Sequence, residues 1–394
     1  MVPSIFYRIQ NPEYGGNRMS TAARAAIVVD AAGAVEIRSY AVPEPGPGEF
    51  VLKLELCGVC GTDAHIYRGR LASVTFPALL GHEIVGTLAA LGDGVTADHG
   101  GRPVAVGDRV GVFPALSCGR CYQCQVRHRP ANCPDRRPSY GFKSPVTAPP
   151  HLTGGFAEYL HAANAGTVFY RTDLPPEVAV LQEPMSVALH GIERGSVGVG
   201  STVVVQGVGA IGLMAVVAAR AAGAHRVVAV GAPAARLELA AALGADATVS
   251  IHDLTGVAER RSAVFDALGA PGADCVIGAS GSPEAFMEAI GLVADGGVLA
   301  ELGNFTDRGT VPFNPFSDLL KRDITIAGVY GAGPDMLRRY HQALLILERG
   351  GWPYDRVVSH RVPLERVGEA LAALGGGSPL DGREIVKLAI DPAA

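Results

Sequence analysis

The 394-residue sequence lacks the features of a membrane protein, a nucleic-acid-binding protein and a disordered chain. Its longest apolar stretch runs from Gly207 to Ala219 and ends at Arg220, which is shorter than the roughly 18 residues that a membrane span needs. It has no run of Lys or Arg, and its net charge of -5 does not favour binding to nucleic acid. Because 48% of the residues are hydrophobic and only 18% are charged, the chain can bury a sizeable core.

The N-terminus also lacks a secretory signal, because no basic region is followed there by an apolar block. We therefore expect a cytoplasmic protein with no membrane or nucleic-acid partner. Residues 1–18 are polar and rich in turn formers, and they form either an ordered arm or a segment that precedes a natural start at Met19. In both cases we interpret residues 1–24 as an N-terminal extension.

Hydrophobic patterning divides the rest of the chain into two regions. Residues 25–115 have the pattern of short strands separated by turns rich in Gly and Pro. From about Glu183 onward, strand patterns alternate with helix patterns, which predicts a doubly wound parallel sheet. The expected strands are Thr202–Gln206, Arg226–Val230, Cys275–Ile277 and Gly297–Leu302, and the expected helices are 209–222, 234–243 and 283–292.

After residue 330 the sequence predicts one more helix, 336–347, and a closing strand, Ile385–Ile390. We expect this tail to pack back on the first region. The predicted architecture is an α/β fold with a β-rich catalytic domain over residues 25–184 and 331–394. A Rossmann dinucleotide-binding domain is expected over residues 185–330.

A glycine-rich motif follows the first strand of the alternating region and opens its first helix. In this motif Gly207 permits a tight turn, Gly209 lets the backbone approach a pyrophosphate, and Gly212 allows close packing of the helix. The free N–H groups at the positive helix end, around Ala210 and Ile211, can bind the pyrophosphate. The alternative is a glycine-rich turn without a ligand, which the strand–turn–helix context disfavours.

The position that distinguishes NAD from NADP carries no acid. The second strand is followed by Gly231, where an Asp or Glu would bind the adenosine ribose hydroxyls. Without it a 2′-phosphate meets no repulsion, and Arg236 lies close enough along the chain to pair with such a phosphate. The alternative is that Arg236 is a solvated helix residue without a phosphate partner. Both NAD and NADP therefore stay open as cofactors.

Four of the seven cysteines form a local cluster, at positions Cys118, Cys121, Cys124 and Cys133. They fall in residues 118–150, a stretch without periodicity, and a loop of this length needs its own organiser. Four thiolates at this spacing suit a closed tetrahedral Zn²⁺ site, which would supply that organiser. A disulfide pair and an iron–sulfur cluster are the alternatives, and a reducing cytosol argues against the disulfide.

A second set of possible metal ligands is dispersed along the chain. It contains Cys60 at the end of an early strand, the neighbours His82 and Glu83, and Glu183 near the boundary of the two regions. A thiolate, an imidazole and a carboxylate suit a catalytic zinc that keeps one open position. Spacing alone leaves a shared metal undecided, because His82 could be a core histidine, and Cys60, like Cys57, a small buried apolar residue.

Taken together, the motifs resemble those of the zinc-dependent medium-chain alcohol and polyol dehydrogenases, in particular the sorbitol- and threonine-dehydrogenase-like branch. The resemblance runs from about Ala25 to the C-terminus, and the motifs occur in the family's order. The chain departs from the family in the spacing between Cys124 and Cys133, which is one residue longer than usual, and in the missing acid at Gly231. The shared motifs are Cys60-Gly-Thr-Asp63, Gly81-His-Glu83, the four cysteines, Gly154-Gly-Phe-Ala-Glu-Tyr159, Glu183-Pro-Met-Ser-Val-Ala-Leu-His190 and the glycine motif.

The resemblance implies a GroES-like catalytic domain in which Cys60 and His82 bind the catalytic zinc and Cys57 does not. Glu183 lies at the family's third-ligand position. Glu83 matches a glutamate that is a ligand in some members and an indirect support of the metal in others, and we rank it just below Glu183.

The resemblance also assigns a proton relay and a supporting acid. Thr62 and His65 match the relay that carries the alcohol proton to solvent, and Asp63 matches the carboxylate that orients His82. Homodimers and homotetramers are the assemblies that the family suggests.

The expected function is hydride transfer between a secondary alcohol or polyol, a small-molecule substrate, and NAD(P)⁺, with one catalytic and one structural zinc ion in each chain. One alternative is a zinc-free quinone or enoyl reductase of the same superfamily, which would lack both cysteine groups. The other is a non-enzymatic dinucleotide-binding protein, which would not need Thr62, His65 and an open metal site together.

Overall fold

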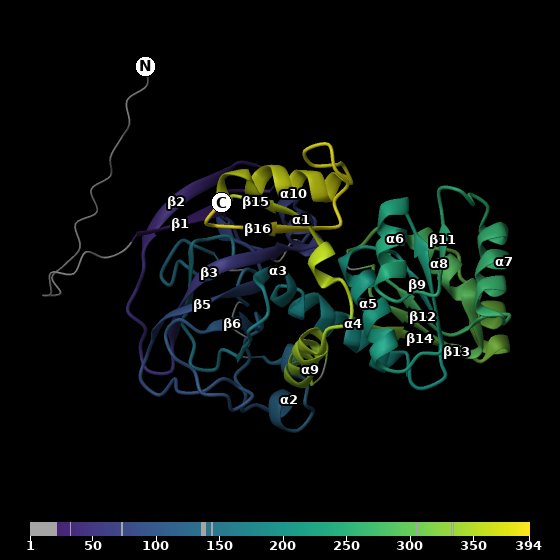
Figure 1. Ribbon diagram of the computed structural model, residues 1–394, viewed down its shortest axis with the longest axis horizontal. Coiled ribbons are helices and arrows are strands. Elements are labelled where there is room, and N and C mark those ends of the chain that lie inside the picture. The colour runs from purple at the N-terminus through teal and green to yellow at the C-terminus, as the bar shows by residue number, and fades with distance from the viewer. Residues whose placement is uncertain are drawn as a thin grey trace, which may run out of the picture.

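The computed structural model describes residues 22–31, 33–71, 74–134, 139–142, 145–304, 306–331, 333 and 335–394. The N-terminal extension expected over residues 1–24 lies outside the described residues as far as residue 21, and the first strand, β1 (Ala22–Val28), begins directly after it. Figure 1 shows a β-rich region that includes the C-terminal strands and, beside it, a sheet flanked by helices.

The β-rich region is built on a mostly antiparallel sheet with the strand order β15-β16-β3-β5-β6-β8, and β7 pairs with β3. In β3, Leu52 and Leu54 are buried while Lys53 between them is exposed, as expected for a strand with one face on the core. The last strand pairs with β3 and places Leu388 opposite Val59, so the C-terminal residues lie beside the end of β3. These strands are β3 (Phe50–Val59), β5 (Glu83–Leu91), β6 (Arg109–Val112), β7 (Tyr159–Ala162), β8 (Phe169–Arg171), β15 (Val358–Val362) and β16 (Lys387–Ile390).

A smaller sheet with the order β2-β1-β4 and several short helices complete this region. Helices α1 and α10 pack against each other next to the end of β3. In the stretch 118–150, expected as a loop, the described residues include the short helix α2 and a 3-10 turn, Pro130–Asn132. The remaining elements are β2 (Val35–Ala41), β4 (Ala78–Leu79), α1 (Gly61–Tyr67), α2 (Tyr122–Gln125), α3 (Pro176–Ala179) and α10 (Val367–Gly376).

The second region is a parallel sheet with the order β11-β10-β9-β12-β13-β14, which confirms the predicted doubly wound sheet. Val203–Val205 and Val227–Val230 are buried along their length, as in strands that helices cover on both faces. The chain runs from β9 outward to β11 and returns to β12 on the other side of β9, and ligands bind at the carboxyl ends of the strands at such a switch point. The strands are β9 (Thr202–Gln206), β10 (Arg226–Gly231), β11 (Ala247–Ser250), β12 (Ala273–Gly278), β13 (Val293–Glu301) and β14 (Thr325–Gly328), and the helices are α5 (Ala210–Ala221), α6 (Ala234–Ala242), α7 (Val257–Leu268) and α8 (Pro283–Leu292).

Two further helices, α4 (Gln182–Arg194) and α9 (Met336–Arg349), lie between these regions in Figure 1. α4 packs on α5 and β13 of the parallel-sheet region, on β5 of the β-rich region and on α9. A residue on α4 is therefore fixed relative to both sheets. Across the described ranges, none of the helices combines the length and the apolar character that crossing a bilayer would require.

Candidate active site

A cavity of about 390 Å³ lies where the carboxyl ends of the parallel strands face the β-rich region. Its walls come from both regions, so the site exists only because the two regions pack together. From the β-rich region come Cys60, Thr62, His65, His82, Glu83, Phe142 and Lys387, and from α4 and the parallel-sheet region come Glu183, Gly209, Ala210, Ile211, Arg236 and Ala279.

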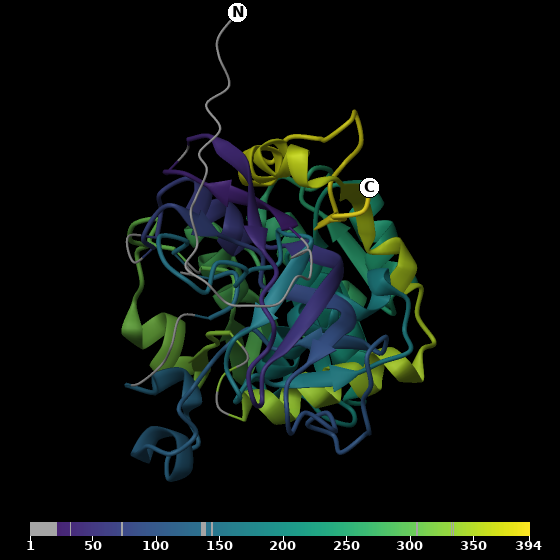
Figure 2. The same ribbon diagram turned by 90° about the vertical axis from the view of Figure 1, so that its left-hand side faces the viewer.

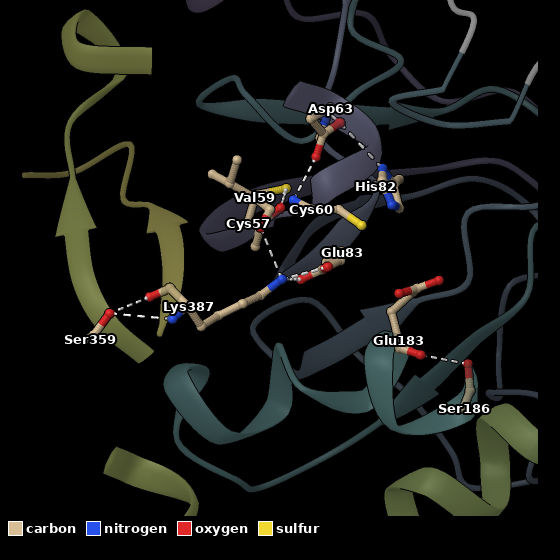
Figure 3. A network of polar contacts seen from close by, with 12 residues as sticks. Cys57, Val59, Cys60, Asp63, His82, Glu83, Glu183, Ser186, Ser359 and Lys387 are labelled. Atoms are coloured by element: carbon tan, nitrogen blue, oxygen red, sulfur yellow. Dashed lines mark hydrogen bonds and ion pairs between the residues drawn. The ribbon is translucent and has the colours of Figure 1, made fainter. Parts of the chain in front are cut away.

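Cys60 is held between the end of β3 and the start of α1. Its backbone is extended (φ −95°, ψ 157°), and its N–H donates to Asp63 Oδ2 at 2.8 Å in a capping arrangement. Figure 3 shows the Cys60 side chain between His82 and Glu83. Cys57 is instead fully buried beside Gly81 and Gly155, and Cys60, just after the strand, lines the cavity.

His82 enters the site through a close backbone approach at Gly81. This glycine has a φ of +91°, and a Cβ there would lie 2.5 Å from the Phe156 ring. His82 Nδ1 lies 3.4 Å from Asp63 Oδ1, which leaves Nε2 for another partner. Burial alone lowers the pKa of His82, but the Asp63 carboxylate more than reverses this effect, and the pKa is raised well above its usual value.

Cys60, His82 and Glu83 each offer one ligand atom, and these atoms lie within 4.8 Å of one another. A thiolate, an imidazole and a carboxylate form a donor set that fits Zn²⁺. Glu83, however, already has a cation: Lys387 Nζ donates to Glu83 Oε1 at 2.5 Å and to the Val59 carbonyl at 3.1 Å (Figure 3). Both charged side chains are almost completely buried, so each compensates the other.

Glu183 lies in the first turn of α4, and its side chain rises from the helix toward Cys60 and His82 (Figure 3). Its backbone carbonyl accepts Ser186 Oγ at 2.6 Å, but its carboxylate has no hydrogen bond or ion pair among the described contacts. Burial raises the pKa of Glu183 to about 7. Glu183 is half-buried and does not belong to the close group of Cys60, His82 and Glu83 ligand atoms. Its carboxylate, which points toward Cys60 and His82 without a cation of its own, fits a position beside a divalent cation held by those residues.

The local cysteine cluster converges in an exposed lobe, which Figure 2 shows with α2 projecting from the molecule. Cys121 Sγ lies 3.5 Å from Cys124 Sγ and 3.9 Å from Cys133 Sγ, and Cys118 completes the group. Four sulfurs bound to a tetrahedral Zn²⁺ are separated by roughly 3.8 Å, so this spacing fits the ion. The N–H of Arg120 is the main cause that lowers the pKa of Cys118 to about 7, which favours the thiolate.

The glycine motif forms a tight turn between β9 and α5. Gly207 has a φ of +102°, and a Cβ on Gly212 would lie 1.8 Å from the Gly207 carbonyl oxygen. Gly209 caps α5, and no heavy atom of the described residues lies within 4 Å of a Cβ built on it. The open space beside the N–H groups of Ala210 and Ile211, both of which line the cavity, fits a pyrophosphate.

Gly231 and Arg236, the two residues considered for the choice between NAD and NADP, both have close contacts within the chain. A Cβ on Gly231 would lie 2.5 Å from Val208 Cγ2, which is a packing reason for the missing acid. Arg236 lines the cavity, but its Nη2 donates to Glu384 Oε1 at 3.0 Å and to the Ile385 carbonyl. Within the described structure its Nε is buried without a hydrogen-bond partner.

Thr62 and His65 line the cavity from α1, but no hydrogen bond joins them in the described part of the chain. A proton relay through both side chains therefore requires a bridging group between them. Burial lowers the pKa of His65, and the nearby cations of Arg70, Arg308 and Arg68 lower it further. The imidazole is thereby kept neutral near neutral pH and able to accept a proton.

Lys387 is a residue of this site that the sequence motifs do not reveal. Its signal is a single lysine within an otherwise apolar strand, where an unpaired charge would be costly. Phe142 lies in the cavity wall. Tyr159 and Trp352 pack against the hydrophobic cores instead.

Two family models match this chain over complementary parts. The model of the alcohol dehydrogenase GroES-like domain matches residues 46–171, and the model of the zinc-binding dehydrogenase matches residues 210–346. The first covers the segments that carry Cys60, His82 and the four cysteines, and the second begins at the N-terminus of α5.

Individual proteins show the same similarity over almost the whole chain. The 5-exo-hydroxycamphor dehydrogenase of Pseudomonas putida is 34% identical over 362 residues, which are 90% of this chain and 96% of the relative. The sorbitol dehydrogenase of Bacillus subtilis is 31% identical and covers 86% of this chain and 89% of its own. A zinc-binding dehydrogenase structure from Sinorhizobium meliloti, solved with NADP bound, superposes with a TM-score of 0.79 at 30% identity and covers 94% of this chain and all of its own.

Proposed function

Because this chain belongs to the zinc-dependent medium-chain alcohol and polyol dehydrogenases, we propose that it oxidises bulky secondary alcohols with a largely apolar body. The predicted family and the predicted enzyme class are confirmed: the protein is a zinc- and NAD(P)-dependent oxidoreductase that acts on alcohols. The zinc-free reductase and the non-enzymatic dinucleotide-binding protein are therefore not supported as alternatives. The substrate and the role of each site residue are the proposal.

The observation that carries the substrate proposal is the apolar wall around the metal-binding side chains. Phe113, Phe142, Val187, Leu302 and Met336 line the cavity around the donor group of Cys60, His82, Glu83 and Glu183. Such a wall favours a compact hydrocarbon skeleton and offers few partners for the hydroxyl groups of a polyol. The relative named 5-exo-hydroxycamphor dehydrogenase supports this choice, because its name describes a rigid bicyclic alcohol.

We assign the catalytic zinc to Cys60, His82 and Glu183. Glu183 is preferred over Glu83 because Glu83 is neutralised by Lys387, whereas the Glu183 carboxylate faces the other donors without a cation of its own. The structural zinc is assigned to the four sulfurs of the exposed lobe. A zinc ion held by three protein donors would keep a fourth coordination position for the alcohol.

When bound, Zn²⁺ lowers the pKa of the alcohol and NAD(P)⁺ accepts its hydride. The chain supplies the remaining functions. The N-terminus of α5 binds the pyrophosphate, and the apolar wall excludes water and orients the alcohol. Thr62 takes the alcohol proton and releases its own hydroxyl proton through a bridging group to the neutral His65 imidazole, which then gives a proton to solvent.

A substrate comparison tests the proposal. The wild-type enzyme should show a kcat/KM for cyclohexanol and borneol at least about tenfold above that for sorbitol, because each buried methylene adds about 0.8 kcal/mol. Val187→Thr, which keeps the shape of the wall but adds a hydroxyl, should lower kcat/KM for the cyclic alcohols without affecting 2-propanol to the same extent. A preference for sorbitol in the wild-type enzyme would contradict the apolar-substrate assignment.

We also propose a homo-oligomer that forms at the edge of the parallel sheet. Among the described residues, β14 is the terminal strand of that sheet, and the segment before it exposes Phe316 (63%) and Leu320 (74%). Light scattering should give a dimer or a larger assembly for the wild type, and the Phe316→Asp/Leu320→Asp variant should have a lower mass. An unchanged mass in the variant would exclude this edge as the interface.

The domain division and the compartment follow from two other observations. Strands β15 and β16 join the sheet of β3, while the parallel sheet takes its strands from residues 202–328, which supports a catalytic domain over 25–184 and 331–394 and a Rossmann domain over 185–330. None of the seven cysteines, all of which lie among the described residues, forms a disulfide bond, which suits a cytoplasmic location.

A further inference from the structure

His190 is a buried side chain that neither the metal sites nor the glycine motif explains. It lies on α4, and because Glu183 and His190 are separated by about two helical turns, the two side chains stand on the same face. Only 4% of His190 is exposed, and its Nδ1 lies 2.9 Å from the Gly331 carbonyl oxygen. The ring is therefore held in one orientation by a specific partner.

That partner lies between β14 and α9, where the described residues form one wall of the active-site cavity. Gly331, Gly333, Tyr330 and Met336 all line this wall. Gly331 and Gly333 have positive φ angles of +54° and +66°. A Cβ on Gly333 would lie 2.2 Å from Cε1 and 2.4 Å from Nε2 of His190, so the backbone of the wall rests directly against the imidazole.

The same helix also holds the element that follows this wall. Glu193 Oε2 accepts from Arg339 Nε at 2.8 Å, and Glu193 Oε1 accepts from Arg338 Nη2 at 2.9 Å. α4 thus carries Glu183 at its start, His190 in its middle and Glu193 near its end. A single rigid helix sets the position of the wall relative to the proposed metal ligand.

We propose that His190 is a positioning residue of the reaction, which fixes the backbone at Gly331 and at Gly333 as the wall that orients the nicotinamide end of the cofactor. The glycine motif receives the pyrophosphate at one side of the cavity, and hydride transfer requires the nicotinamide near the alcohol at the metal ligands. The wall contacts α4, the helix that also carries Glu183. This inference rests on the proposed zinc ligands, and His190 acts through the wall rather than on a reacting atom.

The charges around His190 favour a neutral ring that donates from Nδ1. Burial lowers the pKa of His190, the bond to Gly331 opposes this, and Arg339 and Arg194 lower the pKa further. A neutral imidazole has one N–H, and its contact with a carbonyl oxygen places that hydrogen on Nδ1. An asparagine amide can donate from a similar place, whereas a phenylalanine ring fills the space without a donor.

The test compares His190→Phe, His190→Asn and the control Leu189→Val, a buried neighbour on α4 that does not line the cavity. We expect His190→Phe to lower kcat about tenfold or more, because a misplaced reactant loses orientation. It should also weaken binding of the reduced cofactor while leaving the affinity for ADP-ribose, which has no nicotinamide, unchanged. His190→Asn should recover most of both losses, and Leu189→Val should alter the melting temperature without changing the ratio of the two affinities.

Two results would overturn the proposal: an unchanged affinity ratio in His190→Phe, or a His190→Asn variant as impaired as His190→Phe. If His190→Phe does not fold, Gly333→Ala supplies a second route, because its Cβ meets the imidazole. Gly333→Ala should lower kcat less in a His190→Ala background than in the wild type. Losses of kcat that simply add would show that Gly333 and His190 do not act together. The two proposals can fail separately. A wild-type protein that binds no zinc outside the cysteine lobe would contradict the proposed function. The ratio of the affinities for the reduced cofactor and for ADP-ribose tests His190 and needs no turnover.

Discussion

The two proposed metal sites of this molecule are built in opposite ways. The cysteine lobe takes four identical donors from residues 118–133 and projects from the body of the protein. The catalytic set takes three different kinds of donor from the N-terminus of α1 (Cys60), the residue before β5 (His82) and the first turn of α4 (Glu183), and it lines the cavity between the two regions. The lobe therefore depends on local spacing, whereas the catalytic set depends on the packing of the whole chain.

The surroundings of the two groups differ as much as their donors. In the lobe the thiols mainly contact one another and backbone N–H groups. In the catalytic set His82 is paired with Asp63, and Glu83 is paired with Lys387. The Glu183 carboxylate has no such partner among the described contacts. The lobe is a closed site suited to holding structure, and the catalytic set leaves a side open to the cavity.

The largest expected effect comes from removing a catalytic donor. Cys60→Ser should lower kcat at least about a thousandfold, because the metal supplies several kcal/mol of transition-state stabilisation. Metal analysis should fall from about two zinc ions per chain to about one. Cys57→Ala is the matched control and should keep both ions. Wild-type turnover in Cys60→Ser would contradict the assignment of Cys60 to the catalytic zinc.

Removing a donor from the lobe should have the complementary effect. Cys121→Ser should release only the structural ion and lower the melting temperature by several degrees, because the ion organises a segment with little regular structure. The catalytic ion should remain. The comparison would fail if Cys121→Ser lost as much kcat per folded molecule as Cys60→Ser.

The two glutamates offer a sharper test within the catalytic set. Glu83→Gln leaves Lys387 buried without its counter-charge and should reduce the free energy of unfolding by about 3–5 kcal/mol. Adding Lys387→Met should restore most of it. Glu183→Gln should cost less stability but weaken retention of the catalytic zinc at least about tenfold, as measured by chelator competition. Loss of zinc from Glu83→Gln and not from Glu183→Gln would reverse the ligand assignment.

The smallest expected effect concerns the pH dependence of proton release. His65 must be neutral to accept a proton, and burial together with nearby arginines lowers its pKa below the ordinary 6.5. The acid limb of the kcat profile should therefore lie below that value. Arg308→Met removes a cation that disfavours imidazolium, so the limb should move to higher pH. A limb that stays in place in Arg308→Met, or that moves equally in Cys121→Ser, would argue against His65 as the relay.

Much of the parallel sheet was predictable because its strands are continuous apolar runs between turn residues. The strand Thr202–Gln206 and the helix Pro283–Leu292 have the expected bounds. α7 (Val257–Leu268) was not predicted, since its sequence is rich in charge. Its Arg260 is buried only because Glu288 of α8 binds it, with 2.7 Å between Nε and Oε1. That compensation comes from a neighbouring helix and leaves no pattern in α7 itself.

The start of the closing strand was also not predictable from local sequence. The sequence predicts a strand from Ile385, but β16 begins at Lys387. The Ile385 carbonyl binds Arg236, and the N–H of Val386 donates to Ser359 Oγ at 2.9 Å, so neither group is free for a ladder. Local apolar character thus identified the strand, and contacts from distant segments decided where it starts.

The sequence by itself determined the doubly wound sheet, the dinucleotide turn and the grouping of the four cysteines, because each depends on residues that are close along the chain. Only the tertiary structure decided that Lys387 lies against Glu83, that the Glu183 carboxylate faces Cys60 and His82, and that His190 contacts Gly331 and Gly333. Such pairs are separated by long stretches of chain. Their distances and charges are set by how the two sheets pack around α4, which no local spacing records.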